Sequence, residues 1–139
     1  RLETMVIFIT LILIKVSNMD YLYGEFSDEQ IKNAAMLMHK NIHRLLLYKD
    51  NLVTTKIFNS DEEFKKYFEN ILFKFGGLNT LLGYPEEMVF LMATLQAAYD
   101  IVDSPRYNYG IFRRAILDSH GYIKAMLEEV DNNAKPINS

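Results

Sequence analysis

Two histidines, His39 and His43, have the residue type and spacing that come closest to a chemical site in this sequence. Residues four apart lie on one face of a helix, so the two imidazoles can hold one metal ion between two ring nitrogens. The chain has one other histidine, His120, and no cysteine. A metal would therefore need His120 or a carboxylate from another helix as its third ligand. We favour the simpler interpretation, in which both rings lie half-buried at the border of an apolar stripe, and we expect no cofactor.

The usual sequence signatures of catalysis are missing. The glycines at Gly76-Gly77 and Gly83 fit neither spacing of the phosphate-binding glycine loops. Ser119 is followed by His120, but no acid or oxyanion hole is apparent for a nucleophilic serine. The absence of cysteine excludes thiolate nucleophiles, disulfides and iron–sulfur clusters. We therefore expect a protein that is not an enzyme and has no catalytic residue.

A small basic stripe is the second candidate site. Arg113, Leu117, His120 and Lys124 share one face of a predicted helix, with Arg106 shortly before it. A solvated helix face has this composition, and so does a contact for an acidic protein surface or a nucleic-acid backbone. The net charge of −3 provides no overall attraction to nucleic acid. Nucleic-acid binding through Arg106, Arg113 and Lys124 is thus an alternative that we do not favour.

Length and composition predict a single folded domain. The 139 residues are 50% hydrophobic and 24% charged, which is enough apolar surface for one core. Residues 1–18 form an apolar segment. We expect this segment either to pack on the domain or not to belong to the native protein. Its longest apolar run, residues 5–16, is shorter than the roughly 20 residues of a membrane span. We expect a helical domain over 19–131, a flexible tail over 132–139, and a cytoplasmic protein.

Capping residues and apolar periodicity predict four helices. Ser27-Asp28-Glu29-Gln30 is a capping box, and Ser60-Asp61-Glu62-Glu63 repeats the same signal for a second helix. Gly76-Gly77 is expected to end that second helix. The third helix, over 88–102, follows Pro85 and is apolar around most of its circumference, so we expect it to be central. The predicted fold class is all-α, a compact bundle of about four main helices.

Excess apolar surface on the first and third helices points to a binding function. A helix with one buried side needs a wider polar face than these two helices provide. Seven methionines and nine tyrosines supply adaptable apolar surface. We therefore expect a small non-enzymatic protein-interaction module, present as a homodimer, with a partner of unknown identity. The predicted partner-binding residues are Met36, Leu37, Leu47, Tyr48, Phe90, Arg113 and Lys124.

In general composition the chain resembles the small accessory proteins of bacteria and their phages, rich in Lys, Asn, Ile, Phe and Tyr. This resemblance covers no motif and assigns no residue. It implies a phage or mobile-element factor that binds and inhibits, or helps to assemble, a larger machine.

Overall fold

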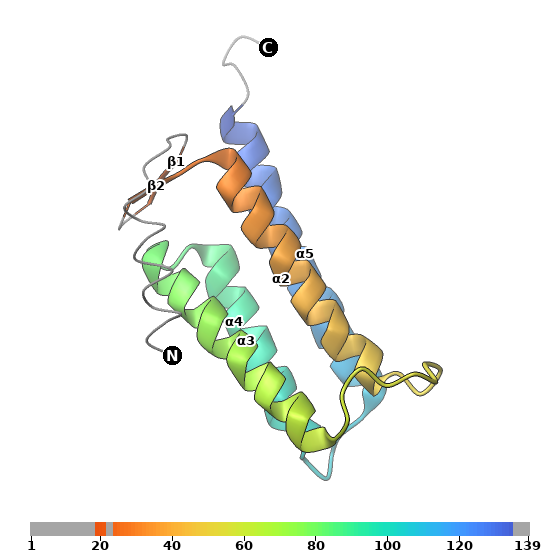
Figure 1. The fold of residues 1–139 in the computed structure, drawn as a ribbon. Coiled ribbons are helices and arrows are strands. Elements are labelled where there is room, and N and C mark those ends of the chain that lie inside the picture. Colours follow the sequence, from red (N-terminus) through yellow and green to blue (C-terminus); the bar gives the residue numbers. More distant parts are fainter. Residues whose placement is uncertain (1–18, 22–23, 135–139) are drawn as a thin grey trace.

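The computed structural model describes residues 19–21 and 24–134, with the side chains of residues 26–129 (Figure 1). A short antiparallel hairpin precedes four helices in this part of the chain, so the predicted helical bundle is confirmed. The elements in chain order are β1 (Met19–Tyr21), β2 (Gly24–Phe26), α2 (Asp28–Lys49), α3 (Asp61–Leu81), α4 (Glu86–Val102) and α5 (Tyr109–Ala134).

The predictions for the two ends of the chain fall mostly outside the described residues. The apolar segment 1–18 lies outside the described residues, as do positions 135–139 of the predicted tail. Within the described part, α5 keeps a helical backbone to Ala134, which includes the first three positions of the predicted tail. Met19 of β1 pairs with Phe26 of β2, a strand pair that the sequence did not indicate.

Both predicted helix starts are confirmed by their hydrogen bonds. The Gln30 N–H donates to Ser27 Oγ at 3.1 Å, and the Ser27 N–H donates to Gln30 Oε1 at 2.9 Å, which completes the capping box of α2. At α3 the Glu63 N–H donates to Ser60 Oγ at 3.1 Å. Each bond satisfies a backbone donor that has no partner inside the helix.

The prediction that Gly76-Gly77 ends α3 is wrong. The helix continues through both glycines to Leu81, because the apolar face continues with Leu78, which is buried. Burial of that side chain outweighs the weak helix preference of glycine. The chain turns instead after Leu82, where Gly83 and Tyr84 have φ values of 79° and 60°.

The prediction that helix 88–102 is the central helix is also wrong. In α4 one face is buried, while Val89, Phe90 and Ala97 are exposed. Two alanines explain part of the error. Ala93 and Ala97 make α4 look apolar in the sequence, but an alanine side chain is so small that its burial or exposure changes little apolar area.

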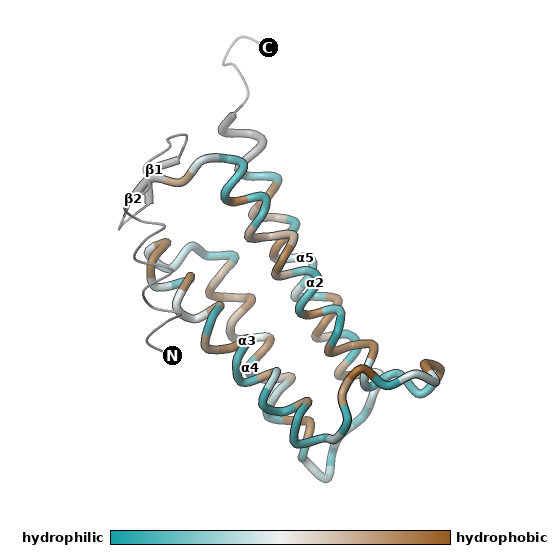
Figure 2. The backbone as a smooth tube through the Cα atoms, viewed as in Figure 1, coloured by the Kyte–Doolittle hydropathy of each residue, from teal (hydrophilic) through white to brown (hydrophobic). Residues whose placement is uncertain are grey.

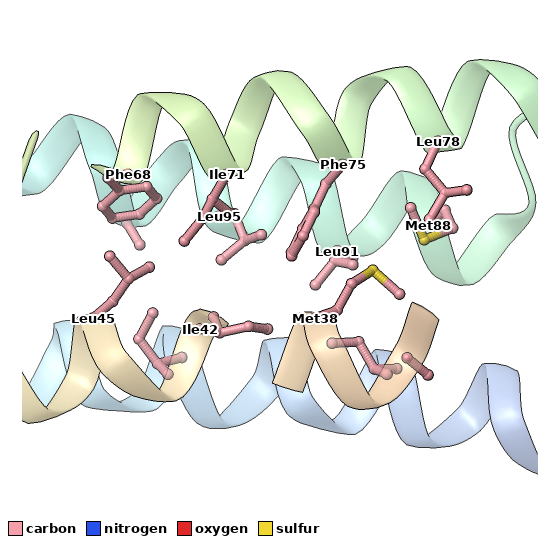
Figure 3. Close-up of a cluster of buried hydrophobic side chains, with 14 of the residues drawn as sticks. Met38, Ile42, Leu45, Phe68, Ile71, Phe75, Leu78, Met88, Leu91 and Leu95 are labelled. Atoms are coloured by element: carbon pink, nitrogen blue, oxygen red, sulfur yellow. The ribbon is translucent and has the colours of Figure 1, made fainter. Parts of the chain in front are cut away.

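The four helices instead surround a shared core, and no helix lies inside the others. Neighbouring pairs in contact are α2–α3, α3–α4, α4–α5 and α2–α5. Side chains of Met38, Ile42 and Leu45 on α2 point toward those of α3 and α4 across the core (Figure 3). Along each helix hydrophobic and hydrophilic residues alternate, as one buried side requires (Figure 2).

Candidate functional site: the α2–α5 face

All three histidines of the chain meet where α2 lies beside α5. His39 Nδ1 lies 2.7 Å from His120 Nδ1, although 81 positions separate the two residues. The ring centres of His43 and His120 are 6.3 Å apart. The two nitrogens in closest contact therefore belong to His39 and His120, across the helices, and not to His39 and His43 along α2.

The rings of His39 and His120 meet end to end rather than face to face. Their centres are 4.9 Å apart and their planes differ by 17°. A ring nitrogen lies about 1.1 Å from the centre of an imidazole, from ordinary C–N bond lengths. Two coplanar rings joined by nitrogens at 2.7 Å would then have centres about 5 Å apart, close to the distance found. The contact is thus an in-plane N–H···N hydrogen bond, with one imidazole as donor and the other as acceptor.

The surroundings of this pair favour the neutral imidazole. Burial lowers the pKa of His39 from its ordinary value. Burial also lowers the pKa of His120, and the nearby charges of His39 and His43 lower it further. A neutral ring has one N–H donor and one nitrogen acceptor, which is what an N–H···N bond between two histidines needs.

The cluster is not a ready-made metal centre. In the part of the chain that the structure describes, no group of three or more His, Cys, Asp or Glu side chains is placed to hold one ion. His43 is exposed and one helical turn from His39. Two converging nitrogens, those of His39 and His120, are what the geometry offers to a metal.

Two stripes of side chains lie on the outside of the bundle beside the contact between His39 and His120, and His120 itself belongs to one of them. Each stripe has the spacing i, i+4, i+7, i+11, which keeps it on one side of its helix. Helices α2 and α5 run antiparallel beside each other (Figure 1), and the contact between His39 and His120 lies where the two stripes adjoin. We call this surface the α2–α5 face; it consists of Met36, Lys40, His43 and Leu47 on α2 and Arg113, Leu117, His120 and Lys124 on α5.

The α2–α5 face combines exposed apolar side chains with positive charge. Met36 is 67% exposed and Leu117 is 40% exposed. Lys40, Arg113 and Lys124 are also exposed, and none of them takes part in the ion pairs found among the described residues.

The charge of this face is one-sided. It contains no acidic residue, and α2 has none between Glu29 and the end of the helix. The nearest acid along the two helices is Asp118 of α5, which lies off the stripe and pairs with Arg114 at 3.3 Å, while Asp50 and Glu128 lie beyond the ends of the face. Helix α4 has the opposite charge bias, because it carries Glu86, Glu87 and Asp100 and no basic residue. It is not one of the two helices that α2 mainly contacts.

The predicted partner-binding residues do not all reach this face. Leu37 is exposed, but it lies one turn before Asn41, which accepts a hydrogen bond from Tyr67 of α3, and so points toward that side. The Tyr48 ring contacts Phe64, and its hydroxyl donates to Asp61 at 2.9 Å.

Phe90 lies on a different side of the bundle. It is 46% exposed on α4, where its ring lies 5.7 Å from that of Tyr122. Of the seven predicted residues, the structure therefore brings together four, which are Met36, Leu47, Arg113 and Lys124. Sequence reasoning missed Lys40, although its spacing four residues after Met36 was a usable signal.

Comparison with known proteins adds no relative: no family model, curated protein or solved structure matches the chain. Within the described residues, none of the helices combines the length and apolar character that crossing a membrane requires.

Proposed function

We propose that the protein is a non-enzymatic helical module that binds an acidic amphipathic segment of another protein on its α2–α5 face. The observation that carries this proposal is the exposure of Met36 and Leu117 among three cations, on two stripes that contain no acid. Large exposed apolar side chains ringed by charge are typical of protein-binding surfaces. A role in inhibiting or assembling a larger phage or mobile-element machine would act through this contact.

The charge of the face argues for an acidic partner and against a homodimer through this surface. A twofold dimer places the same patch of each copy opposite itself. The cations Lys40, Arg113 and Lys124 would then face their own copies, and like charges across an interface oppose association. Carboxylates on a partner would turn this repulsion into attraction. Apolar side chains between those carboxylates would cover Met36 and Leu117.

The two parts of the face would contribute differently to binding. Full burial of an apolar side chain such as Met36 or Leu117 is worth at most about 1.5–3 kcal/mol. The cations would mainly speed association and select the partner, and exposed charges are screened by salt over about 10 Å at 0.1 M. We therefore expect binding of moderate affinity that weakens as the salt concentration rises.

Position-specific crosslinking tests this function in the cells that express the protein. A photocrosslinking amino acid replaces Leu117 on the face, or Ala97 on the exposed side of α4 as the control. We expect Leu117 to capture one acidic protein and Ala97 not to capture it. Charge reversal by Arg113→Glu with Lys124→Glu should abolish the product while the thermal melt of the variant stays unchanged. The proposal fails if both positions give the same products, or if charge reversal has no effect.

A second candidate function, metal binding, is favoured by the meeting of His39 and His120. Zinc bound by two imidazoles at about 2.0–2.1 Å in tetrahedral geometry needs nitrogens roughly 3.3 Å apart. The two Nδ1 atoms are 2.7 Å apart, so a small rotation of the rings would admit the ion in place of the shared proton. His43 or water would complete the coordination. Calorimetric titration with zinc chloride should show one site per chain that His120→Ala removes; absence of binding heat rejects this candidate.

A further inference from the structure

Helices α4 and α5 form a second exposed surface, which shares only α5 with the α2–α5 face. The two helices pack on each other, and they lie behind α3 and α2 in the view of Figure 1. An open groove of about 640 Å³ runs between them on the outside of the bundle. We call this surface the α4–α5 face; it consists of Phe90, Ala93 and Ala97 on α4 and Ile111, Arg114, Ala115, Asp118 and Tyr122 on α5.

The α4–α5 face has small side chains in its middle and large apolar side chains toward its ends. Phe90 is 46% exposed and lies beside Tyr122, with the two ring centres 5.7 Å apart. Ile111 is 59% exposed and lies about three helical turns before Tyr122 on α5, at the other end of the face. Ala93 and Ala97 line the groove between these ends. Exposed apolar side chains of this size on one surface are typical of protein-binding sites.

The charges in the middle of this face balance each other. Arg114 and Asp118 form an exposed ion pair along α5, with nitrogen and oxygen 3.3 Å apart. An exposed pair of this kind contributes little stability, so each member is available to an opposite charge on another molecule. The acids on the exposed side of α4, Glu86 and Asp100, lie near the ends of that helix. In contrast to the α2–α5 face, the middle of the α4–α5 face therefore has no excess charge that would repel a second copy.

The order of the residues along α5 makes this face complementary to itself. In a twofold dimer with antiparallel α5 helices, a residue opposite a given position of the partner copy is matched by the reverse contact. Arg114 and Asp118 are centred on Ile116, and Ile111 and Tyr122 are centred within one residue of the same point. One axis at this level therefore places Arg114 of each copy opposite Asp118 of the other. The same axis places Ile111 opposite Tyr122.

We propose that two copies of this chain associate through their α4–α5 faces into a twofold dimer in which the α5 helices run antiparallel. Opposite charges and apolar side chains lie at equal distances from one centre, which is the pattern that a second copy requires. Ala97 lines the same groove as Arg114 and Asp118, so it lies near the axis, where its small side chain allows the helices to approach closely. This dimer leaves the α2–α5 face of each copy uncovered, and the inference does not depend on the proposed binding function.

Charge exchange tests the dimer by sedimentation equilibrium of the purified full chain. We expect the mass of the wild type to approach twice 16.2 kDa as the protein concentration rises. Arg114→Asp places acid opposite acid at both symmetry-related contacts, and Asp118→Arg places cation opposite cation. Each single variant should raise the dimer dissociation constant about tenfold or more, and the double variant should restore it. The matched control Lys66→Glu disrupts the exposed ion pair with Glu62 on α3 and should leave the dissociation constant unchanged.

Three results of this experiment would each overturn the dimer. The first is a wild-type chain that stays monomeric throughout. The second is an unchanged dissociation constant in both single variants, which would place any dimer contact elsewhere on the chain. The third is a double variant that dissociates as readily as the single variants.

A second measurement uses the absence of cysteine from the chain and keeps the dimer testable if the charge variants fail to fold. Ala97→Cys places one thiol of each copy near the axis, within the range that a disulfide can bridge. Oxidation with diamide should then join two copies covalently. The control Lys66→Cys, on the exposed side of α3, should stay monomeric under the same treatment. Equal crosslinking of the two variants would overturn the dimer, as would no crosslinking of Ala97→Cys.

Discussion

Replacing Gly121 with alanine is expected to stabilise the bundle. Gly121 lies in the interior of α5 on an exposed side, and an added Cβ would have nothing within 4 Å. The substitution therefore introduces no clash and loses no packing. Glycine in an exposed helix interior costs about 0.8–1 kcal/mol relative to alanine, largely because the unfolded chain has more backbone freedom. The free energy of unfolding should rise by that amount.

Two other glycines make this a graded test. At Gly76 an added Cβ would lie 3.7 Å from the Met92 Cε atom, an ordinary contact, so Gly76→Ala should give a similar gain. At Gly110 the Cβ would lie 2.9 Å from Asn108 Oδ1, the atom that accepts the hydrogen bond of the Ile111 N–H at the start of α5. Gly110→Ala should therefore destabilise the chain by disturbing that cap.

Thermal and urea unfolding followed by circular dichroism measures all three variants. For a domain of this length, 1 kcal/mol corresponds to a shift of roughly 3–4 °C in melting temperature. We expect Gly121→Ala and Gly76→Ala to melt above wild type and Gly110→Ala below it. No gain for Gly121→Ala, or an equal gain for Gly110→Ala, would refute the reasoning from helix preference and local space.

Three further substitutions are expected to have defined effects on stability. Ser27→Ala removes half of the capping box of α2 and should cost about 1 kcal/mol in urea unfolding, whereas Ser104→Ala serves as a loop control. Leu95→Ala empties a fully buried site in the shared core and should cost about 2–5 kcal/mol by the same measurement. A hydrogen bond that protonated Glu129 donates to Glu87, together with the negative charge of Glu87, raises the pKa of Glu129, so stability falls as the pH rises through that pKa. Glu129→Gln should therefore raise the melting temperature slightly at pH 7 and leave it unchanged at pH 4; the same shift at both values would contradict this.

Much of the fold could be predicted because its causes are local. The hydroxyls of Ser27 and Ser60 cap helices in the structure as their sequence contexts predicted, since a cap needs only residues within one turn. The Gly76-Gly77 prediction failed because glycine can either end a helix or continue it. Here the helix continues because Leu78 is buried against the rest of the bundle. A local sequence pattern carries no information about that burial.

The site was harder to predict than the helices because it depends on how two helices align. The spacing of His39 and His43 indicated a pair along α2, yet the hydrogen bond forms with His120 of α5. That contact requires the antiparallel alignment of α2 and α5, which hydrophobic periodicity does not fix. The apolar character of α4 misled for a similar reason, because composition says how much of a helix is apolar but not which side a neighbour covers.

The opposite charge bias of α2 and α4 gives this chain an electric moment across the bundle. A net charge of −3 would, for a uniform surface, repel the molecule from any polyanion. With Lys40, Arg113 and Lys124 on one flank and the acids of α4 on another, the approaching molecule instead experiences a torque that turns the α2 flank forward. At low ionic strength the protein should consequently bind weakly to a cation-exchange resin above its isoelectric point of about 5.6, an unusual property for an acidic protein.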